Sequence, residues 1–352
     1  MARAAPGVRR HLEVALQGAW QSRGALSLAL VPASWVFGAV AGARRLLHAR
    51  GHLDVARLPV PVIVVGNLVV GGAGKTPTVI AIVSLLQRHG FTPGIVSRGY
   101  GRRAERDVEV VTPESDAACV GDEPLLLRRR TGVPVVVGRD RVAAGHALLA
   151  AEPQVDIIVS DDGLQHLALK RDVEVLVFDE RGAGNGRLLP AGPLREPLPR
   201  SLRAQALVVY NAAAPTTPLP GHLAQPRLAG LVPLGAWWRG EAATNEALVS
   251  LRGKEVIAAC GVARPQRFFA LLRAGGLTIR ELALEDHFDF KTLPWPLTAG
   301  DVVVTEKDAV KLVPARPIGN RVWVAALDFK LAPAFETALL ALVAPAPSRP
   351  RD

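Results

Sequence analysis

The sequence predicts an α/β protein: a P-loop three-layer α/β/α nucleotide-binding domain, with a second, smaller α/β domain and an N-terminal apolar membrane-associating helix. Three observations carry this prediction. Short apolar, β-branched runs alternate with stretches patterned like helices, a glycine-rich turn follows the first of these runs, and an apolar segment flanked by Arg precedes it. Continuous apolar runs are typical of parallel strands buried on both faces of a sheet. With 352 residues and 49% hydrophobic content, the chain is long enough for two or three domains with real cores.

Residues 1–57 are the predicted membrane-associating segment. They hold eight Arg against Glu13 and Asp54, which accounts for +6 of the formal net charge of +10. Between Arg23 and Arg44 lie 20 uncharged residues, GALSLALVPASWVFGAVAGA. Basic flanks around such a segment favour a helix that lies in the interface of an anionic membrane surface. A helix that spans the bilayer and a helix buried in the core are the alternatives.

The turn VVGGAGKTP (69–77) follows the strand-like run PVIVVG and precedes the helical pattern TVIAIVSLLQRHG. Gly74, Lys75 and Thr76 match a phosphate-binding loop, in which backbone N–H groups and a helix N-terminus surround phosphates, although Val69 stands at its first glycine position. Lys75 is expected to reach the β- and γ-phosphates, and the Thr76 hydroxyl to bind Mg²⁺. A glycine-rich turn with one exposed Lys is the alternative. The residues expected to contact ATP are Val69, Val70, Gly71, Gly72, Ala73, Gly74, Lys75 and Thr76.

Further strands complete the predicted organisation. The nucleotide-binding domain is expected over residues 58–210, with strands after the loop at 92–98, 108–112, 133–137, 155–160, 173–179 and 206–210. Residues 211–226, NAAAPTTPLPGHLAQP, gain Pro and lose periodicity, which indicates a linker. The smaller domain is expected over 227–343, with strands at 255–261, 301–308 and 321–327 and a helix at PQRFFALLRAGG. The tail 344–352 is expected to be disordered.

Two adjacent acids end the apolar strand in the stretch VDIIVSDDGLQH. Asp161 and Asp162 stand at the end of an apolar strand, where a magnesium-binding acid of P-loop proteins belongs. Ligands bind at the carboxyl ends of strands in open α/β sheets, so either acid could reach Mg²⁺ beside the loop. Gln165 and His166 follow on the same turn. They are candidates to orient water or a substrate phosphate, or they are simply solvated.

Two further polar clusters lie outside the predicted strands. In GDEP, Asp122 is a candidate general base for an acceptor hydroxyl, although its spacing alone favours an acid that stabilises a helix N-terminus. In SRGYGRR, Arg98, Arg102 and Arg103 are candidates to bind a phosphate of the acceptor. An exposed basic loop is the equally weighted alternative for these arginines.

Several function classes are disfavoured. Cys119 and Cys260 lie far apart without His or Cys at ligand spacing, so neither a zinc site nor a disulfide framework is indicated. A GTPase usually needs Asn/Thr-Lys-x-Asp, and the only Lys followed two residues later by Asp is Lys170, which Leu169 precedes. Nucleic-acid binding is not expected, because the excess charge lies beside the apolar segment and is not interleaved with aromatic residues.

Taken in order, the motifs resemble the tetraacyldisaccharide 4′-kinases of lipid A biosynthesis. The resemblance runs from VPASWVFGAVAGARRLLHARG through VGNLVVGGAGKTP, SRGYGR, GDEP, DDGLQH, NGRLLPAGPLREP, CGVARPQRF and DHFDF to VVVTEKDAVKL. It implies transfer of the γ-phosphoryl group of ATP, with Mg²⁺, to the 4′-hydroxyl of an acylated glucosamine disaccharide 1-phosphate. Such an enzyme is expected at the cytoplasmic face of the inner membrane.

The resemblance also implies roles for individual residues. Asp122, paired with His287 of DHFDF, takes the hydroxyl proton. Glu196 joins Thr76 and one of the two strand-end acids around Mg²⁺. Arg98 and Tyr100 lie near the acceptor. The alternative class is a ParA/MinD-like switch ATPase, which shares the glycine pattern but carries a signature lysine where this chain has Val70.

Overall fold

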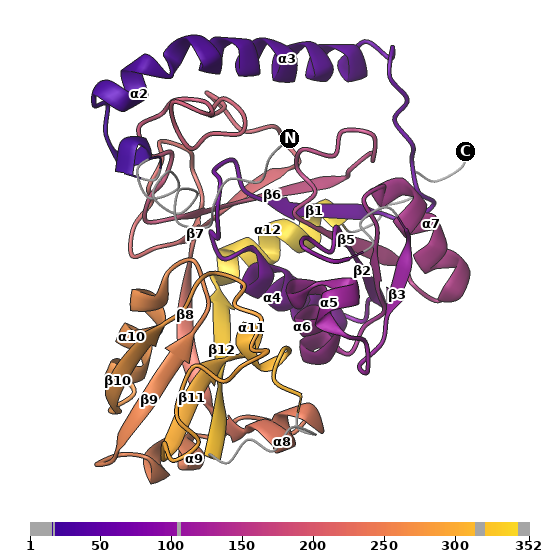
Figure 1. The fold of residues 1–352 in the computed structure, drawn as a ribbon. Helices are drawn as coiled ribbons and strands as arrows, with labels where there is room; N and C mark the ends of the chain where they lie inside the picture. Colours follow the sequence, from indigo (N-terminus) through magenta and orange to yellow (C-terminus); the bar gives the residue numbers. More distant parts are fainter. Residues whose placement is uncertain (1–15, 17, 104–106, 314–320, 344–352) are drawn as a thin grey trace. The chain divides into compact units, whose positions relative to one another are not determined.

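The computed structural model describes residues 16, 18–103, 107–313 and 321–343 (Figure 1). They form two compact units, each assembled from separate stretches of the chain. The first unit contains the described residues up to Lys75, residues 162–224 and those from Leu331 onward, and the second contains residues 76–161 and 225–330. Arg3, Arg9 and Arg10 and the predicted tail at 344–352 lie outside the described residues.

The first unit is built on parallel strands. Its strand order is β8-β7-β6-β1, and the pairs β1 with β6, β6 with β7 and β7 with β8 are all parallel. The strands are β1 (Val62–Gly66), β6 (Val173–Asp179), β7 (Ala206–Asn211) and the start of β8 (His222–Pro233). Every residue of β1 is buried, as expected for a parallel strand covered on both faces. The helix α12 (Pro333–Val343) packs on β6 and β7.

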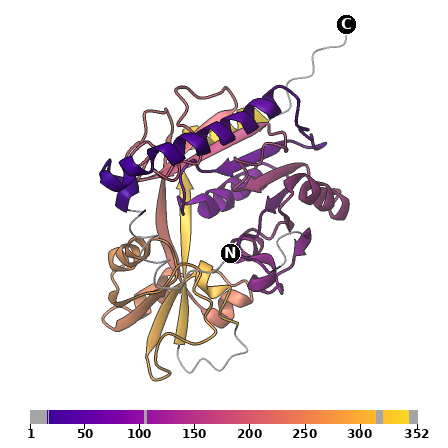
Figure 2. The same ribbon diagram turned by 45° about the horizontal axis from the view of Figure 1, so that its top comes forward.

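The predicted apolar segment is helical. It forms α2 (Ala25–Ala29) and α3 (Val31–Ala49), and Figures 1 and 2 show α3 running along the loops that follow β6. The face that packs inward is polar at two points: the Ser27 hydroxyl donates to the Ala191 carbonyl at 2.6 Å, and the Ser34 hydroxyl donates to the Leu188 carbonyl at 2.8 Å. In the described part of the chain, no helix has both the length and the apolar character that crossing a bilayer requires.

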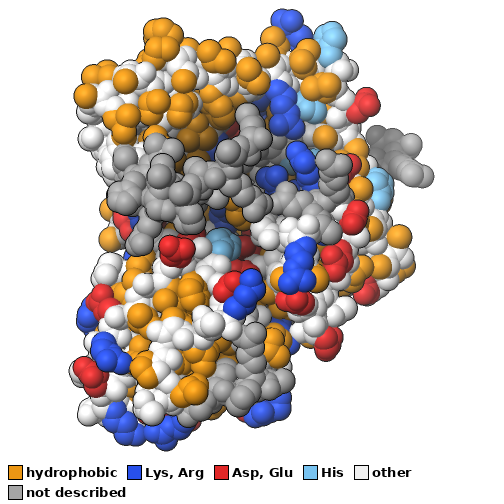
Figure 3. Space-filling model, in the orientation of Figure 1, with side chains coloured by type: hydrophobic (Ala, Val, Ile, Leu, Met, Phe, Trp, Pro, Cys, Tyr) orange, Lys and Arg blue, Asp and Glu red, His pale blue; other side chains and the backbone are white. Residues whose placement is uncertain are grey.

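The outward face of this arm is apolar. Trp35 is 70% exposed, and Val36 and Val40 are each 66% exposed. In Figure 3, hydrophobic side chains gather over α2 and α3. The helix therefore buries serines and exposes large apolar residues, which is the reverse of the pattern of a helix on a water-soluble core.

The second unit begins with the helix that follows the phosphate-binding loop. In its first stretch, β2 pairs in parallel with β5 and β4, whereas β3 pairs antiparallel with β4. The elements are α4 (Lys75–Arg88), β2 (Pro93–Ser97), β3 (Glu109–Val111), α5 (Ala117–Val120), α6 (Asp122–Thr131), β4 (Val135–Val137), α7 (Arg141–Ala151) and β5 (Ile157–Asp161). These bounds agree with the strands expected at 92–98, 108–112, 133–137 and 155–160.

The second stretch of this unit has the strand order β10-β9-β11-β12-β8. Strand β9 pairs in parallel with β10 and β11, and β11 with β12. The elements are α8 (Leu234–Trp238), α9 (Asn245–Ser250), β9 (Glu255–Cys260), α10 (Pro265–Ala274), β10 (Thr278–Ala283), β11 (Asp301–Thr305), α11 (Glu306–Ala309) and β12 (Arg321–Leu331). Phe268 and Phe269 of α10 pack into a buried cluster with the strands. The α/β fold class expected from the sequence is confirmed.

Two strands lack a sequence prediction. Strand β8 starts at His222, inside the range 211–226 expected as a linker, and its first residues pair with β7. Pro226, and Gly230 with a φ of 151°, interrupt the alternation that would mark it as a strand. Strand β10 (TIRELA) has no buried residue, and its charged side chains fit an edge position in the sheet.

The hydrogen bonds of Ser34 that hold α3 in place can be tested by substitution. Ser34 also accepts a hydrogen bond from the Ala191 N–H at 3.0 Å. Ser34→Ala therefore removes the partner of this N–H, whereas the Leu188 carbonyl keeps its bond from the Gly192 N–H. A buried N–H left without a partner costs about 1–3 kcal/mol. We expect the α3 amides to exchange with deuterium at least about tenfold faster, a factor that corresponds to about 1.4 kcal/mol. The matched control is Ser201→Ala at an exposed position. Unchanged exchange in α3 would show that these bonds do not hold the arm.

Candidate functional site

The start of the phosphate-binding loop is pinned as a strand. The Val70 N–H donates to the Pro193 carbonyl at 2.9 Å, and the Arg195 N–H donates to the Leu68 carbonyl at 2.7 Å. Between these bonds Val69 forms an antiparallel bridge with Leu194, and its side chain is 1% exposed. A buried, strand-like position suits a β-branched residue, which explains why this loop has Val where the usual pattern has Gly.

The tight part of the loop begins after Val70. Gly71 and Gly74 have φ values of 93° and 94°, a region that favours glycine. A Cβ on Gly74 would lie 2.3 Å from Nδ2 of Asn211. The same Nδ2 donates to the Ala73 carbonyl at 3.2 Å, and Nδ2 of Asn67 donates to the Gly71 carbonyl at 3.0 Å. Side-chain amides therefore hold two carbonyl groups of the loop.

Lys75 begins α4 beside acidic and amide groups of the first unit. Its Nζ lies 3.2 Å from Oδ1 of Asn67 and 3.6 Å from Oδ1 of Asp162. The same Asp162 oxygen lies 3.2 Å from Nη1 of Arg195. Asp162 has a φ of 50°, a left-handed conformation that is uncommon outside glycine. The predicted phosphate-binding lysine and one predicted metal-binding acid are therefore neighbours.

This cluster extends to the acid of the sequence PLREP. Nη1 of Arg195 also donates to Oε1 of Gln165 at 3.2 Å, and Nε2 of Gln165 donates to Oε1 of Glu196 at 3.2 Å. Oε2 of Glu196 pairs with Nη1 of Arg45 from α3 at 3.1 Å. Because residues 193–195 pair with the start of the loop, Glu196 is carried into the same polar network. We call Asn67, Lys75, Asp162, Gln165, Arg195 and Glu196 the loop cluster.

Other predicted residues lie elsewhere. Asp161 belongs to the second unit, where it is buried and its Oδ2 accepts from the Ser97 hydroxyl at 3.2 Å. Thr76 follows Lys75 in α4, and the His166 N–H donates to the Gly163 carbonyl at 2.9 Å within the turn after β5. Arg98 is exposed at the end of β2. Arg102 is buried and donates to the Asp107 carbonyl, so it does not offer an exposed cation.

The second candidate cluster contains the predicted acid–histidine pair. Asp122 is the first residue of α6, and its Oδ2 lies 3.0 Å from Nδ1 of His287. His287 has a φ of 61°, so a non-glycine residue holds a left-handed conformation here, as often occurs at functional sites. The ring of Tyr100 lies 6.1 Å from the His287 ring. The structure therefore brings together Asp122, His287 and Tyr100.

Two lysines of the segment VVVTEKDAVKL flank this pair. Nζ of Lys307 lies 3.2 Å from Nε2 of His287 and 2.9 Å from Oε1 of Glu123. Nζ of Lys311 lies 3.4 Å from Oδ2 of Asp122, and its side chain is 7% exposed. We call Asp122, Glu123, His287, Lys307 and Lys311 the acid–histidine cluster.

The surroundings shift the pKa values of Asp122 and His287 in opposite directions. Burial alone would raise the pKa of Asp122, but the hydrogen bond to His287 and the charges of Lys311, His287 and Lys307 outweigh it, so this pKa lies below its usual value. The bond to Asp122 raises the pKa of His287 against the opposing effects of burial and Lys307, with Glu123 and Asp286 adding to the rise. Asp122 is thus held ionised, the form that a general base requires.

Five residues of the two clusters carry no role in the sequence predictions: Asn67, Arg195, Glu123, Lys307 and Lys311. All five lie in segments that carry the resemblance, but nothing in their spacing indicates chemistry. Lys307 and Lys311 share a four-residue spacing after a strand, which is a weak signal that both face one side of a helical turn.

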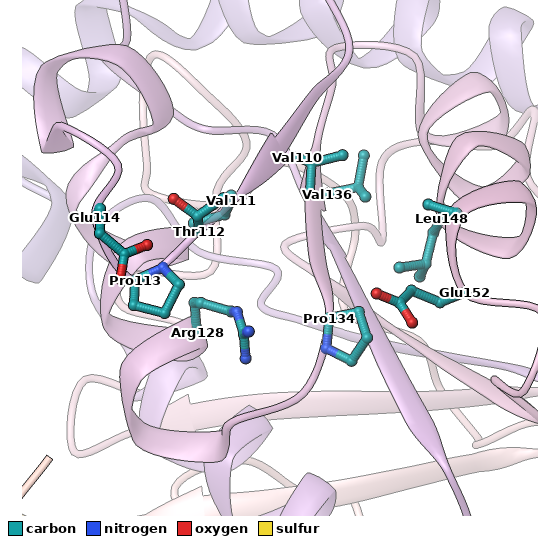
Figure 4. A pocket seen from close by; sticks show the side chains of 11 residues that line it. Val110, Val111, Thr112, Pro113, Glu114, Arg128, Pro134, Val136, Leu148 and Glu152 are labelled. Atoms are coloured by element: carbon teal, nitrogen blue, oxygen red, sulfur yellow. The ribbon is translucent and has the colours of Figure 1, made fainter.

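The second unit has a cavity of about 310 Å³, and no residue of either cluster lines it (Figure 4). Val110, Pro113, Arg128, Leu148 and Glu152 are among its lining residues, from β3, α6 and α7 and the segments beside them. None of the predicted site residues lines it. The candidate chemistry is therefore not located in this cavity.

The fold and these side chains define a P-loop α/β protein that carries the groups of a phosphotransferase. The chain belongs to the family described as tetraacyldisaccharide-1-P 4′-kinase, whose profile matches residues 26–344. The resemblance seen in the sequence is thereby confirmed, and the switch-ATPase alternative is not favoured.

Relatives of known name match nearly the whole chain. It is 57% identical to a tetraacyldisaccharide 4′-kinase of Leptothrix cholodnii, over 95% of this chain and 97% of the relative. It is 53% identical to one of Methylibium petroleiphilum, over 96% and 95%. Among solved structures, it matches the "apo" form of LpxK from Aquifex aeolicus in complex with ATP at 27% identity and a TM-score of 0.74, over 90% of this chain and 99% of that one.

The position of Lys311 predicts a change in pH dependence. Because the ammonium of Lys311 lowers the pKa of Asp122, activity that needs ionised Asp122 is lost only when the pH falls through this lowered value. Lys311→Met is expected to raise that pKa, so the acid limb of the kcat profile should move to higher pH. Lys330→Met, at an exposed position, serves as the control. An acid limb that coincides with that of the unmodified protein would exclude this effect of Lys311.

Proposed function

We propose that this protein transfers the γ-phosphoryl group of ATP to the 4′-hydroxyl of an acylated glucosamine disaccharide 1-phosphate, a step of lipid A biosynthesis that forms lipid IVA. The proposal rests on family membership and on one observation in particular, the 3.0 Å hydrogen bond between Asp122 and His287. An ATPase that only switches a partner needs no base for an alcohol. A kinase with a hydroxyl acceptor does.

The loop cluster provides the groups for ATP. Lys75 would place its ammonium against the β- and γ-phosphates, in place of its present neighbours Asn67 and Asp162. Backbone N–H groups of residues 71–74 and the N-terminus of α4 would add the neutral donors of a phosphate site. Arg195 would supply a second cation beside Asp162. Together, Lys75 and Arg195 would balance the negative charges of the phosphates and of the Asp162 carboxylate.

The same cluster fits Mg²⁺. In the described residues, no three acidic, His or Cys side chains converge enough to hold an ion by themselves. Magnesium in kinases is usually bound by one or two carboxylates, with substrate phosphates and water completing its shell. Asp162 and Glu196, which are connected through Arg195 and Gln165, would supply these carboxylates, and Thr76 would add a hydroxyl. Bound Mg²⁺ neutralises charge that develops on the phosphates.

The acid–histidine cluster provides the base. Asp122 would accept the proton as the O–H bond of the acceptor breaks, while the acceptor oxygen forms its bond to phosphorus and ADP leaves. His287 donates to Asp122 through Nδ1 and thereby fixes the carboxylate. Tyr100, which is 63% exposed and lies beside His287, would contact the acceptor, together with Arg98, Gln165 and His166.

Acceptor dependence tests this function. ADP release by the purified protein should be slow with ATP alone and rise many-fold when the disaccharide 1-phosphate is added in detergent. Lys75→Ala should remove most of this rise without loss of fold, because its side chain faces Asn67 and Asp162 and not the apolar core. ATP turnover that ignores the lipid would favour the switch ATPase.

A double-mutant cycle tests the base. Asp122→Asn should slow transfer by roughly 10²–10⁴, the usual contribution of general-base catalysis, with a smaller change in ATP affinity. His287→Ala should affect the same step. If the two act as one unit, the double variant should lose far less than the product of the single losses. Glu246→Gln, at an exposed position, is the control. Losses that multiply independently would contradict a paired mechanism.

The arm formed by α2 and α3 would hold the enzyme at the membrane that contains its acylated acceptor. Its outward face carries Leu26, Leu28, Trp35, Val36, Val40, Leu46 and Leu47, each at least 43% exposed. Arg44 and Arg50 are exposed on the same arm and would attract anionic lipid by about 1 kcal/mol each. Since ATP is cytosolic, the cytoplasmic face of the inner membrane is the expected location.

Vesicle binding tests this role of the arm. Val36→Ser with Val40→Ser should weaken binding to anionic vesicles about tenfold or more, since apolar burial is lost. Arg44→Gln with Arg50→Gln should weaken it mainly at low salt. Arg45 is left intact because it pairs with Glu196. In neutral detergent all variants should match the unmodified enzyme in activity. Binding that neither pair of changes affects would contradict the assignment.

A further inference from the structure

Arg181 packs against the outside of the phosphate-binding loop. Its Nη1 donates to the Val70 carbonyl at 3.2 Å, and its Nη2 donates to the Gly72 carbonyl at 3.0 Å. Nη1 would lie 3.2 Å from a Cβ on Gly71. One guanidinium group therefore bridges the two carbonyl groups on either side of Gly71. Arg181 contacts neither the loop cluster nor the acid–histidine cluster in the bonds described above.

Asp179 fixes this guanidinium. It ends β6, its side chain is fully buried, and it accepts from Nε of Arg181 at 3.1 Å and from Nη2 at 2.8 Å. The Arg181 N–H also donates to Oδ1 of Asp179 at 3.0 Å. Such charge-assisted, two-point pairs are strong and geometrically specific. The arginine is thus anchored to a sheet strand while its far side holds the loop.

The peptide geometry gives these contacts a consequence. In a trans peptide the C=O and the next N–H point in opposite directions. When Arg181 holds the carbonyls of Val70 and Gly72 on the outside, the N–H groups of Gly71 and Ala73 must point to the opposite side. Successive N–H groups turned to one side form the concave sites that bind anions.

We propose that Arg181 is a positioning residue that holds the phosphate-binding loop in the shape that accepts a nucleotide. It raises the affinity for the phosphates of ATP and ADP, and it does not change the affinity for the acceptor lipid. This inference rests on the proposed function only in so far as the loop binds a nucleotide.

Direct nucleotide binding tests the inference without the lipid. The variants are Arg181→Gln, which removes the charge, and Arg181→Lys, which keeps a cation for Asp179 but cannot bridge two carbonyls. Arg200→Gln, at an exposed position of the same unit, is the control. Kd for ATP and ADP is measured by calorimetry, and KM for ATP and for the acceptor by ADP release. Tm shows whether each variant is folded.

We expect Arg181→Gln to weaken ATP and ADP binding about tenfold or more, because charge-assisted hydrogen bonds to the loop are lost. Arg181→Lys should show a smaller loss in the same direction. KM for the acceptor should stay within about twofold, and the control should bind ATP normally. If Arg181→Gln does not fold, the lysine variant decides by the same criteria.

Two results would overturn the inference. One is unchanged Kd for ATP in folded variants. The other is an equal rise of KM for ATP and for the acceptor together with a large fall in Tm, because that pattern marks a merely structural role. A protein that binds ATP with the predicted arginine dependence but does not phosphorylate the lipid would contradict the proposed function and leave the role of Arg181 intact.

Discussion

The first unit of this protein depends on one short piece of pairing, in which residues 68–70 bond to residues 193–195. It gives the phosphate-binding loop a strand-like entrance, so a buried Val69 can replace the usual glycine. It also draws a distant segment of the chain against the loop. Arg195 and Glu196 reach Asp162 and Gln165 as a direct result, and Glu196 in turn holds Arg45 of the apolar arm.

The two clusters have different electrostatic characters, and each matches one half of a phosphoryl transfer. The loop cluster sets the cations Lys75 and Arg195 against Asp162, an arrangement that suits an anion with a bound cation. The acid–histidine cluster surrounds a largely buried Asp122 with the cations Lys307 and Lys311, which keeps a carboxylate ionised away from water. In the proposed function, the loop cluster supplies the phosphate site and the acid–histidine cluster supplies the base.

Much of this could be predicted from the sequence, since the parallel strands are continuous apolar runs and the motif GKT is local. The strands β1, β6 and β7 follow from these apolar runs, and the helix after the loop follows from its helical pattern. Arg181, Lys307 and Lys311 could not be assigned, because their roles come from contacts with residues far away in the chain and not from spacing. Adjacent acids gave no means to separate Asp161 from Asp162, whereas the structure turns the first toward Ser97 and the second toward Lys75. For the arm formed by α2 and α3, the apolar composition was evident from the sequence. The sequence did not indicate that serines form its buried face.

Above all, we propose that this protein transfers the γ-phosphoryl group of ATP to the 4′-hydroxyl of an acylated disaccharide. The most direct test is to incubate the purified protein with ATP, Mg²⁺ and the disaccharide 1-phosphate, and to locate the new phosphate on the isolated lipid by phosphorus and proton NMR. We predict a single new phosphomonoester at the 4′ position, with the original 1-phosphate intact. A lipid recovered unchanged while ATP is consumed, or a second phosphate attached at the 1-phosphate as a diphosphate, would contradict it.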